Sequence, residues 1–268
     1  MEKYQQANLA LWNEWATINA QSEMYDLAGF KAGKCALKPI ELQELGDVTG
    51  KTLLHLQCHF GLDTLSWARR GARVTGADFS DEAISLAKSL SRELDIPADF
   101  VCSDIYNLPQ VLSGQFDVVF TSYGVLCWLR DLTRWAEIVA HFLKPGGTFY
   151  IVEFHPFAWV FDDDNPSELR VKYGYFHTPE PTEWTVQGSY ADRNAHVKQP
   201  VEYEWAHSLG DILNALIAAG LRIEFLHEFP YSVEKTFPFM ERDPDGWWRL
   251  KEPPAQIPLT FSLKAIKV

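Results

Sequence analysis

Short apolar runs alternate with segments of helical hydrophobic spacing along most of the chain. Apolar runs of this length predict buried strands, and apolar residues that recur every three or four positions predict helices. The predicted strands are residues 51–57, 72–78, 98–104, 116–122, 148–155, 221–229 and 259–267. The predicted helices are residues 62–71, 81–94, 132–143 and 211–220. This alternation is typical of an α/β fold.

Residues at the predicted helix ends support these boundaries. Ser80 is placed to cap a helix whose first turn contains Asp81 and Glu82, where carboxylates face the positive end of the helix. Gly71 and Gly220 follow predicted helices at positions where a left-handed cap is favoured. The helices are therefore expected to be short and separately capped.

The strand composition also predicts how the strands pair. The runs at 98–104 and 116–122 are apolar enough to be buried on both faces, which favours a parallel sheet. No segment of good helical periodicity separates 221–229 from 259–267, so these two strands are expected to pair antiparallel. We predict a doubly wound, mostly parallel seven-stranded sheet with an antiparallel last strand.

The length of 268 residues fits one domain with additions. After the fifth predicted strand the alternation lapses in a stretch rich in aromatic residues, proline and aspartate, which we interpret as a lid. The expected parts are an N-terminal helical cap, the core, the lid insertion, and a C-terminal helix with strands, at residues 1–45, 46–155, 156–205 and 206–268.

Charge, hydropathy and cysteine spacing limit the kinds of molecule with which the protein is expected to interact. The formal charge of −12, with 36 acidic against 24 basic residues, disfavours nucleic acid, because phosphate backbones would be repelled. No run of about twenty apolar residues predicts a membrane span, and the first residues lack the order of a signal peptide. Four widely spaced cysteines without a CxxC pair fit reduced thiols. We expect a cytoplasmic protein, monomeric or homodimeric, that acts on a small molecule.

Two carboxylates stand at neighbouring strand ends, where parallel α/β sheets bind ligands. Asp78 ends the second strand about twenty residues after the first loop, a position suited to accepting hydrogen bonds from both ribose hydroxyls. Helix capping is the alternative role, but Ser80 already fills it. Asp104, after the third strand, is placed to accept from an adenine amine, or alternatively to cap a short helical turn.

The ordered motifs resemble those of the class I S-adenosylmethionine (SAM)-dependent methyltransferases over roughly residues 45 to 155. They read LLHLQCHFGLDTLSWARRGARVTGADFS, VCSDIYNLP, FDVVFTSYGVLCWL and LKPGGTFYIVEF. The resemblance implies a seven-stranded Rossmann-like fold, SAM as the cofactor and methyl transfer as the activity. The cofactor-binding residues that it implies are Gln57, Cys58, His59, Gly61, Asp78, Phe79, Asp104, Ile105, Ser122 and Tyr123.

The first loop departs from the family pattern, which usually reads acidic-x-Gly-x-Gly-x-Gly. His55 replaces the acidic residue, Gln57 and His59 replace two glycines, and Gly61 remains. Bulkier residues must adopt an uncommon positive φ or hold the loop further from the ligand. His55 is expected in the core. His59 is expected either to hydrogen-bond the methionyl carboxylate or to make a structural hydrogen bond.

The acceptor side is predicted from residues near the later strand ends. His155 is the candidate base or orienting residue, with packing under the lid as its alternative role. Tyr123 is a second candidate at the reaction site. Aromatic residues near the start of the chain and in the insertion are expected to cover the cofactor. The expected substrate-binding residues are Trp12, Tyr25, Trp128 and His155, and no metal site is predicted.

Three other functions compete with this interpretation. A metalloid methyltransferase would use thiolates such as Cys58 and Cys102, which lie on or beside predicted buried strands. A sensor or non-catalytic subunit would bind SAM or a nucleoside without turnover. An NAD-dependent oxidoreductase is disfavoured, because pyrophosphate binding requires the glycine spacing more strictly. The acceptor atom (nitrogen, oxygen, sulfur or carbon) stays open.

Overall fold

The computed structural model describes residues 3–251 and 256–268, and it confirms the predicted fold class. Seven strands form one sheet in the order β3-β2-β1-β4-β5-β12-β8, in which β12 runs antiparallel to both β5 and β8. The other neighbours are parallel. The sheet strands are β1 Thr52–Leu56, β2 Arg73–Asp78, β3 Asp99–Cys102, β4 Phe116–Ser122, β5 Leu143–Phe154, β8 Leu221–Phe229 and β12 Thr260–Lys267.

The helices begin where the sequence places capping residues. Ser80 Oγ accepts from Ala83 N at 3.1 Å, and Ser208 forms a capping box with Asp211. The helices are α1 Lys3–Gln21, α2 Leu27–Lys31, α3 Pro39–Leu45, α4 Leu62–Arg69, α5 Asp81–Glu93, α6 Leu108–Val111, α7 Leu132–Phe142 and α8 Leu209–Ala218. Short 3₁₀ turns lie at η1 Ile105–Asn107, η2 Leu126–Trp128 and η3 Ala158–Val160. No helix in the described part of the chain is long and apolar enough to cross a membrane.

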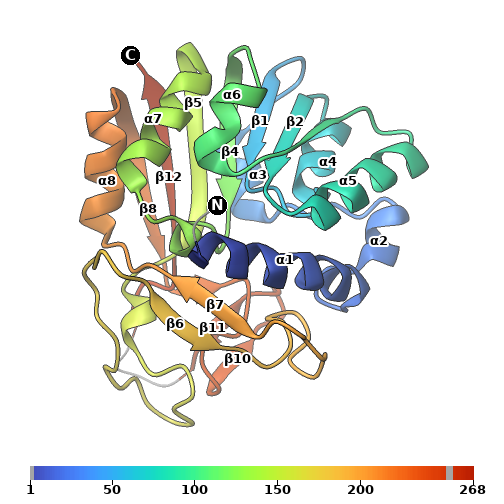
Figure 1. The fold of residues 1–268 in the computed structure, drawn as a ribbon. Coiled ribbons are helices and arrows are strands. Elements are labelled where there is room, and N and C mark those ends of the chain that lie inside the picture. Colours follow the sequence, from blue (N-terminus) through green and yellow to red (C-terminus); the bar gives the residue numbers. More distant parts are fainter. Residues whose placement is uncertain (1–2, 252–255) are drawn as a thin grey trace.

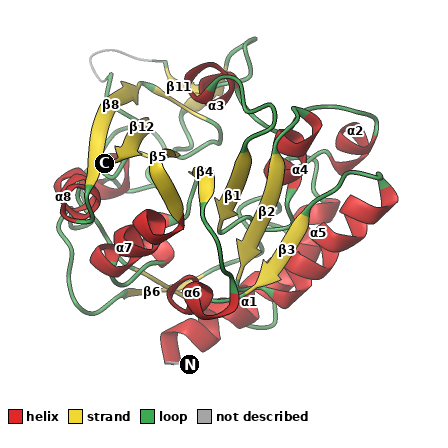
Figure 2. Cartoon of the chain, turned by 90° about the horizontal axis from the view of Figure 1, so that it is seen from above, coloured by secondary structure: helices red, strands yellow, loops and turns green. Residues whose placement is uncertain are grey.

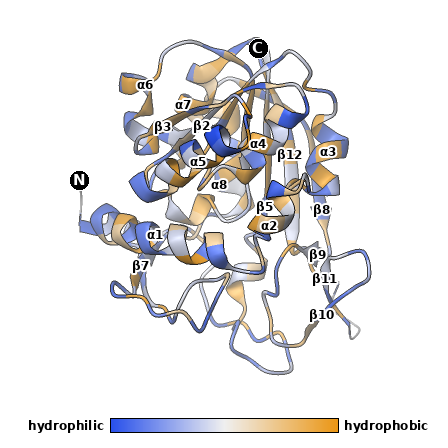
Figure 3. Cartoon of the chain, turned by 90° about the vertical axis from the view of Figure 1, so that its right-hand side faces the viewer, coloured by the Kyte–Doolittle hydropathy of each residue, from blue (hydrophilic) through white to orange (hydrophobic). Residues whose placement is uncertain are grey.

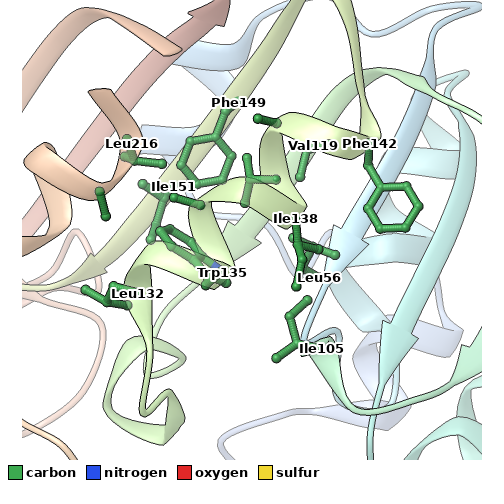
Figure 4. Close-up of a cluster of buried hydrophobic side chains, with 14 of the residues drawn as sticks. Leu56, Ile105, Val119, Leu132, Trp135, Ile138, Phe142, Phe149, Ile151 and Leu216 are labelled. Atoms are coloured by element: carbon green, nitrogen blue, oxygen red, sulfur yellow. The ribbon is translucent and has the colours of Figure 1, made fainter. Parts of the chain in front are cut away.

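Helices cover both faces of the sheet, as Figure 2 shows for α7 and α8 on one side and α3 and α4 on the other. The larger core lies beneath α7 and α8, where Trp135 and Phe149 are fully buried together with Ile151 and Leu216 (Figure 4). The sheet and the inner sides of the helices are mostly hydrophobic, and the outer helix surfaces are largely hydrophilic (Figure 3). Burial on both faces explains the continuous apolar runs of the central strands.

The segments in which strands and helices no longer alternate fold into two small sheets. A hairpin of β6 Thr182–Thr185 and β7 Val201–Glu204 lies in the insertion, and β9, β10 and β11 form a three-stranded sheet before the last strand. The bounds of these three strands are Tyr231–Ser232, Met240–Arg242 and Trp248–Leu250. Figure 1 shows both small sheets below the main sheet, with α1 running between the main sheet and the β6–β7 hairpin.

Candidate active site

A cavity of about 1930 Å³ lies between the carboxyl ends of the parallel strands and the segments that cover them. Its lining includes residues from α1, from the first loop, from the loop after β4 and from the β6–β7 hairpin. Every residue expected to bind the cofactor lines this cavity, as do three of the four expected to bind the substrate. The fourth, His155, does not.

The loop after β1 takes a left-handed backbone at each position where the family pattern has glycine. The φ angles are 56° at Gln57, 50° at His59 and 81° at Gly61. The loop therefore adopts the uncommon backbone conformation despite its bulkier residues, and such residues cost about 1–3 kcal/mol each. Gly61 has a further constraint, because a Cβ there would lie 2.8 Å from the Phe100 ring. This packing explains why the third glycine is retained.

Hydrogen bonds hold the strained loop in place. Asp78 at the end of β2 accepts from His59 N at 2.8 Å and from Ser80 N at 2.9 Å, one through each carboxylate oxygen. Gln57 Nε2 donates to Val125 O at 3.0 Å, which joins the loop to the segment after β4. Gln57 Oε1 is buried and has no hydrogen-bond partner among residues 3–251 and 256–268. The loop therefore has a buried acceptor that a ligand donor would satisfy.

His59 is held among rings above this loop. Its Nε2 lies 3.2 Å from Asn19 Nδ2 of α1, and its ring centroid lies 5.2 Å from that of Trp12 and 5.6 Å from that of Tyr25. Burial lowers the pKa of His59 to about 3, so the imidazole is neutral at pH 7. Its Nδ1 is buried without a partner in the described part of the chain. In this arrangement Nε2 accepts from Asn19, and Nδ1 is left as the free donor.

The two strand-end carboxylates differ in their surroundings. Asp78 is only 7% exposed, and burial raises its pKa to about 6 although backbone N–H groups oppose the rise. Asp104 accepts from Tyr106 N at 2.9 Å, which is the capping role considered for it, and its other oxygen accepts from Gln5 of α1. Each carboxylate oxygen has a second lone pair, so capping and ligand binding are compatible at both positions.

A second group of carboxylates lies on the other side of the loop. Asp63 of α4 accepts from Ser122 Oγ at 3.2 Å, and Glu41 of α3 accepts from the Tyr123 hydroxyl at 3.1 Å. Glu41 is fully buried, and burial together with the nearby Asp63 raises its pKa to about 8. Sequence reasoning missed Glu41 and Asp63. Glu41 lies outside the motifs quoted for the family, and the sequence pattern identifies Asp63 only as part of a predicted helix.

His155 is not among the residues that line the cavity, although its neighbours Phe154 and Pro156 are, and its role as base or substrate ligand stays a prediction. Its Nε2 lies 2.8 Å from Glu228 Oε1 on β8, and its Nδ1 accepts from Phe157 N at 3.1 Å. The side chain is 4% exposed, and burial lowers its pKa against the opposing effect of Glu228. The contact with β8 and the burial of the ring are also compatible with the alternative role of His155, packing under the lid.

The aromatic residues expected to bind the substrate come together through α1. The Trp12 ring centroid lies 5.3 Å from that of Trp128, and Tyr25 shares a 2.5 Å hydrogen bond with the hydroxyl of Tyr190 from the insertion. Trp128 donates through Nε1 to Gly124 O at 2.8 Å. The cap, the loop after β4 and the insertion therefore meet over the same cavity.

The left-handed backbone at Gln57 can be tested by substitution. We expect Gln57→Gly to be more stable than Gln57→Ala by about 1 kcal/mol, because both variants lose the side chain and only glycine relieves the positive φ. Urea denaturation of the two variants measures the difference. An alanine variant at least as stable as the glycine variant would contradict this loop conformation.

Sequence reasoning also missed Glu202 and Glu204 of β7, which line the cavity. Glu202 is 9% exposed, and burial together with Glu204 raises its pKa from 4.5 to about 8. The native state therefore keeps this proton at a pH where the unfolded state has released it, so stability falls as the pH rises from about 4.5 to 8. The signal that identifies these residues is spatial, because nothing in the local sequence distinguishes them.

Glu202→Gln is expected to remove this loss of stability. At pH 8.5 the variant should exceed the wild type in unfolding free energy by roughly 2 kcal/mol, and at pH 4.5 the difference should nearly vanish. Denaturant titrations at the two pH values provide the measurement. A constant difference across the range would show that Glu202 does not titrate as its burial implies.

Comparison with known proteins identifies similar sequences. A sequence family described as "Methyltransferase domain" matches residues 54–151. A ubiquinone biosynthesis O-methyltransferase from Xanthomonas oryzae pv. oryzae is 30% identical over 145 residues, covering 53% of this chain and 56% of the relative. One from Escherichia coli is 31% identical over 133 residues, covering 48% and 55%. The chain thus matches little more than half the length of these curated relatives.

Solved structures share the fold. A SAM-dependent methyltransferase from Mesorhizobium loti aligns with a TM-score of 0.60 at 21% identity, over 88% of this chain and 99% of that one. The geranyl diphosphate C-methyltransferase of Streptomyces coelicolor, solved with Mg²⁺, geranyl diphosphate and S-adenosyl-L-homocysteine, aligns with a TM-score of 0.54 at 16% identity, over 85% and 77%. At such identities the likeness concerns the fold.

Proposed function

We propose that this chain, which belongs to the class I SAM-dependent methyltransferases, transfers the methyl group of SAM to a small molecule held in the aromatic cavity. The observation that carries the proposal is the loop Gln57–Gly61. It keeps the left-handed backbone of a glycine-rich SAM loop at φ 56°, 50° and 81°, and a buried carboxylate at the end of β2 anchors it.

Two polar groups left without partners fit the methionyl end of SAM. Gln57 Oε1 is a buried acceptor that suits the methionyl ammonium, and His59 Nδ1 is a buried donor that suits the methionyl carboxylate. Asp78 stands one strand away for the ribose hydroxyls, and Asp104 with Ile105 stands after the next strand for the adenine. These donors and acceptors follow the expected order of the cofactor along the strand ends.

In methyl transfer the protein contributes mainly by aligning the acceptor with the methyl group and by excluding water. Bound SAM supplies an electrophilic methyl group on a sulfonium sulfur, which an acceptor nucleophile displaces in line. Trp12 and Trp128 pack over the loop and close the cavity above it, and Tyr123 lines its wall with its hydroxyl held by Glu41. The electron-rich ring faces also favour a positive centre such as a sulfonium.

The acceptor is proposed to be a small molecule bound on the insertion side of the cavity. The curated relatives are named for O-methylation in ubiquinone biosynthesis, but the match covers the methyltransferase domain and leaves out much of their length. The acceptor of this chain is therefore argued from its own side chains. The lining there comes from the β6–β7 hairpin and from residues 233–238.

Label transfer tests the proposal. Purified protein is incubated with methyl-labelled SAM and a small-molecule metabolite extract, and label should appear in a compound other than SAM. Asp78→Ala should lower this transfer at a SAM concentration that just saturates the wild type, because its SAM affinity is reduced. SAM binding without any labelled product would favour the sensor function over the enzyme, and failure to bind SAM would contradict both.

A further inference from the structure

Two carboxylates on β7 point the same way into the cavity. Glu202 and Glu204 are two positions apart on one strand, so their side chains share a face. Across the hairpin Trp184 pairs with Glu202, and Thr182 pairs with Glu204. All four residues line the cavity. An acidic and partly aromatic wall therefore faces the space in which the acceptor would lie.

This wall lies close to the strand end where transfer is expected. Trp205, directly after β7, donates its backbone N–H to Cys127 O at 2.8 Å in η2, the turn that follows β4. The Cys127 thiol lies beside Glu204. Burial raises the pKa of this thiol, and the nearby carboxylates of Glu204, Glu153 and Glu202 raise it further. The acidic wall is thus tied to the loop that carries Tyr123 and Trp128.

Among residues 3–251 and 256–268, no cation forms an ion pair with Glu202. The residue is buried, with 9% of its surface exposed, and its Oε2 has no hydrogen-bond partner among the described residues. The cavity-lining Lys172 pairs with Asp162 instead, at 2.8 Å. The charged neighbour that acts on Glu202 is Glu204, and Asp163 adds further negative charge beside Glu204. Burying two such charges is costly, so without a ligand Glu202 keeps its proton at pH 7, and a bound cation would take the place of that proton.

Two aromatic rings lie beside the Glu202–Glu204 pair. Trp184 lies opposite Glu202 on the hairpin, and Tyr173 packs edge-on against Trp184 with ring centroids 5.1 Å apart. Both rings line the cavity. Carboxylates and aromatic faces in one wall are the combination that receives a cation, since both attract positive charge. An anionic acceptor would be repelled by an ionised carboxylate there, and a neutral one would supply no charge to stabilise the ionised form of Glu202.

We propose that Glu202 and Glu204, with Trp184 beside them, bind a positively charged nitrogen of the methyl acceptor, so that the acceptors of this chain are small organic amines. The inference rests on the proposed methyltransferase function and adds the substrate class. The charged nitrogen serves as the group by which the acceptor is held, and the geometry does not require it to be the atom that is methylated. A bound cation would stabilise both carboxylates in the ionised form, so that Glu202 releases its proton when the amine binds.

Fractionation of the acceptor tests the inference without any variant. A small-molecule extract is passed over a cation exchanger at pH 7, and the retained and unretained fractions are assayed separately with methyl-labelled SAM. Labelled product is expected from the retained fraction. Product from the unretained fraction alone would overturn the inference while leaving the methyltransferase function intact. No product from either fraction would overturn the proposed function, and the inference with it.

A charge-neutral variant separates binding of the amine from folding. The double variant Glu202→Gln with Glu204→Gln should raise the KM for the retained acceptor at least tenfold, with kcat and the SAM affinity changed much less. Glu137→Gln, on the exposed side of α7, removes the same charge outside the cavity lining and should leave both constants unchanged. An unchanged KM in the double variant would contradict the role of the pair.

Discussion

Replacing Asp78 with alanine is expected to weaken SAM binding at least tenfold, a loss of about 1.4 kcal/mol or more. Two effects combine. The variant loses the carboxylate proposed to accept from the ribose, and it loses the acceptor that holds His59 N at 2.8 Å in the strained first loop. Isothermal titration of the wild type and the variant with SAM measures the change.

The matched control is Asp99→Ala, which removes an exposed carboxylate from the start of β3, next to β2 in the sheet. It should bind SAM as the wild type does. Asp78→Asn serves as a second variant, because it keeps the size and one acceptor oxygen and should fall between wild type and alanine. Equal SAM affinity in Asp78→Ala and in the wild type would contradict the placement of the ribose.

Replacing Glu153 with alanine is expected to lower the unfolding free energy by about 3 kcal/mol, because buried N–H groups would lose their acceptor. The Glu153 carboxylate at the end of β5 is 4% exposed. It accepts from the backbone N–H groups of Gly124, Val125, Leu126 and Phe154. Glu153 therefore shapes the turn after β4, which carries Trp128.

Urea denaturation tests this effect, with Glu153→Gln as the comparison. Glutamine keeps one acceptor oxygen, but its amide nitrogen faces N–H donors, so an intermediate loss is expected. Label transfer should fall in both variants even at saturating SAM, since the turn after β4 forms part of the acceptor wall. A loss below about 1 kcal/mol in Glu153→Ala would show that the turn is held by other contacts.

The fold could be predicted from sequence because its signals are local and periodic. The continuous apolar run of β4 and the helical spacing of α7 reflect burial of the same residues, such as Val119 and Trp135, that form the core. The antiparallel last strand followed from the missing helix before it. The β9–β11 sheet was not predicted, because its strands of two or three residues are too short to show a period.

The candidate site was predictable where it follows strand ends. Asp78 and Asp104 could be placed because their positions depend on the order of strands alone. Contacts made by α1 could not, since Gln5 reaches Asp104 and Asn19 reaches His59 across long separations in the chain. Glu202 could not be predicted from the sequence for the same reason, because its place in the cavity depends on contacts between distant segments. The role of His155 stays a prediction, because a strand end determines where a residue lies but not which way its side chain turns.

The account depends most on the claim that a loop with one remaining glycine forms a SAM site. Isothermal titration of the wild-type protein with S-adenosylhomocysteine, the demethylated cofactor, tests this claim without an acceptor. We predict one binding site per chain, with an affinity reduced at least tenfold in Asp78→Ala and unchanged in Asp99→Ala. No detectable binding to the folded wild-type protein, or the same affinity in all three proteins, would contradict the account.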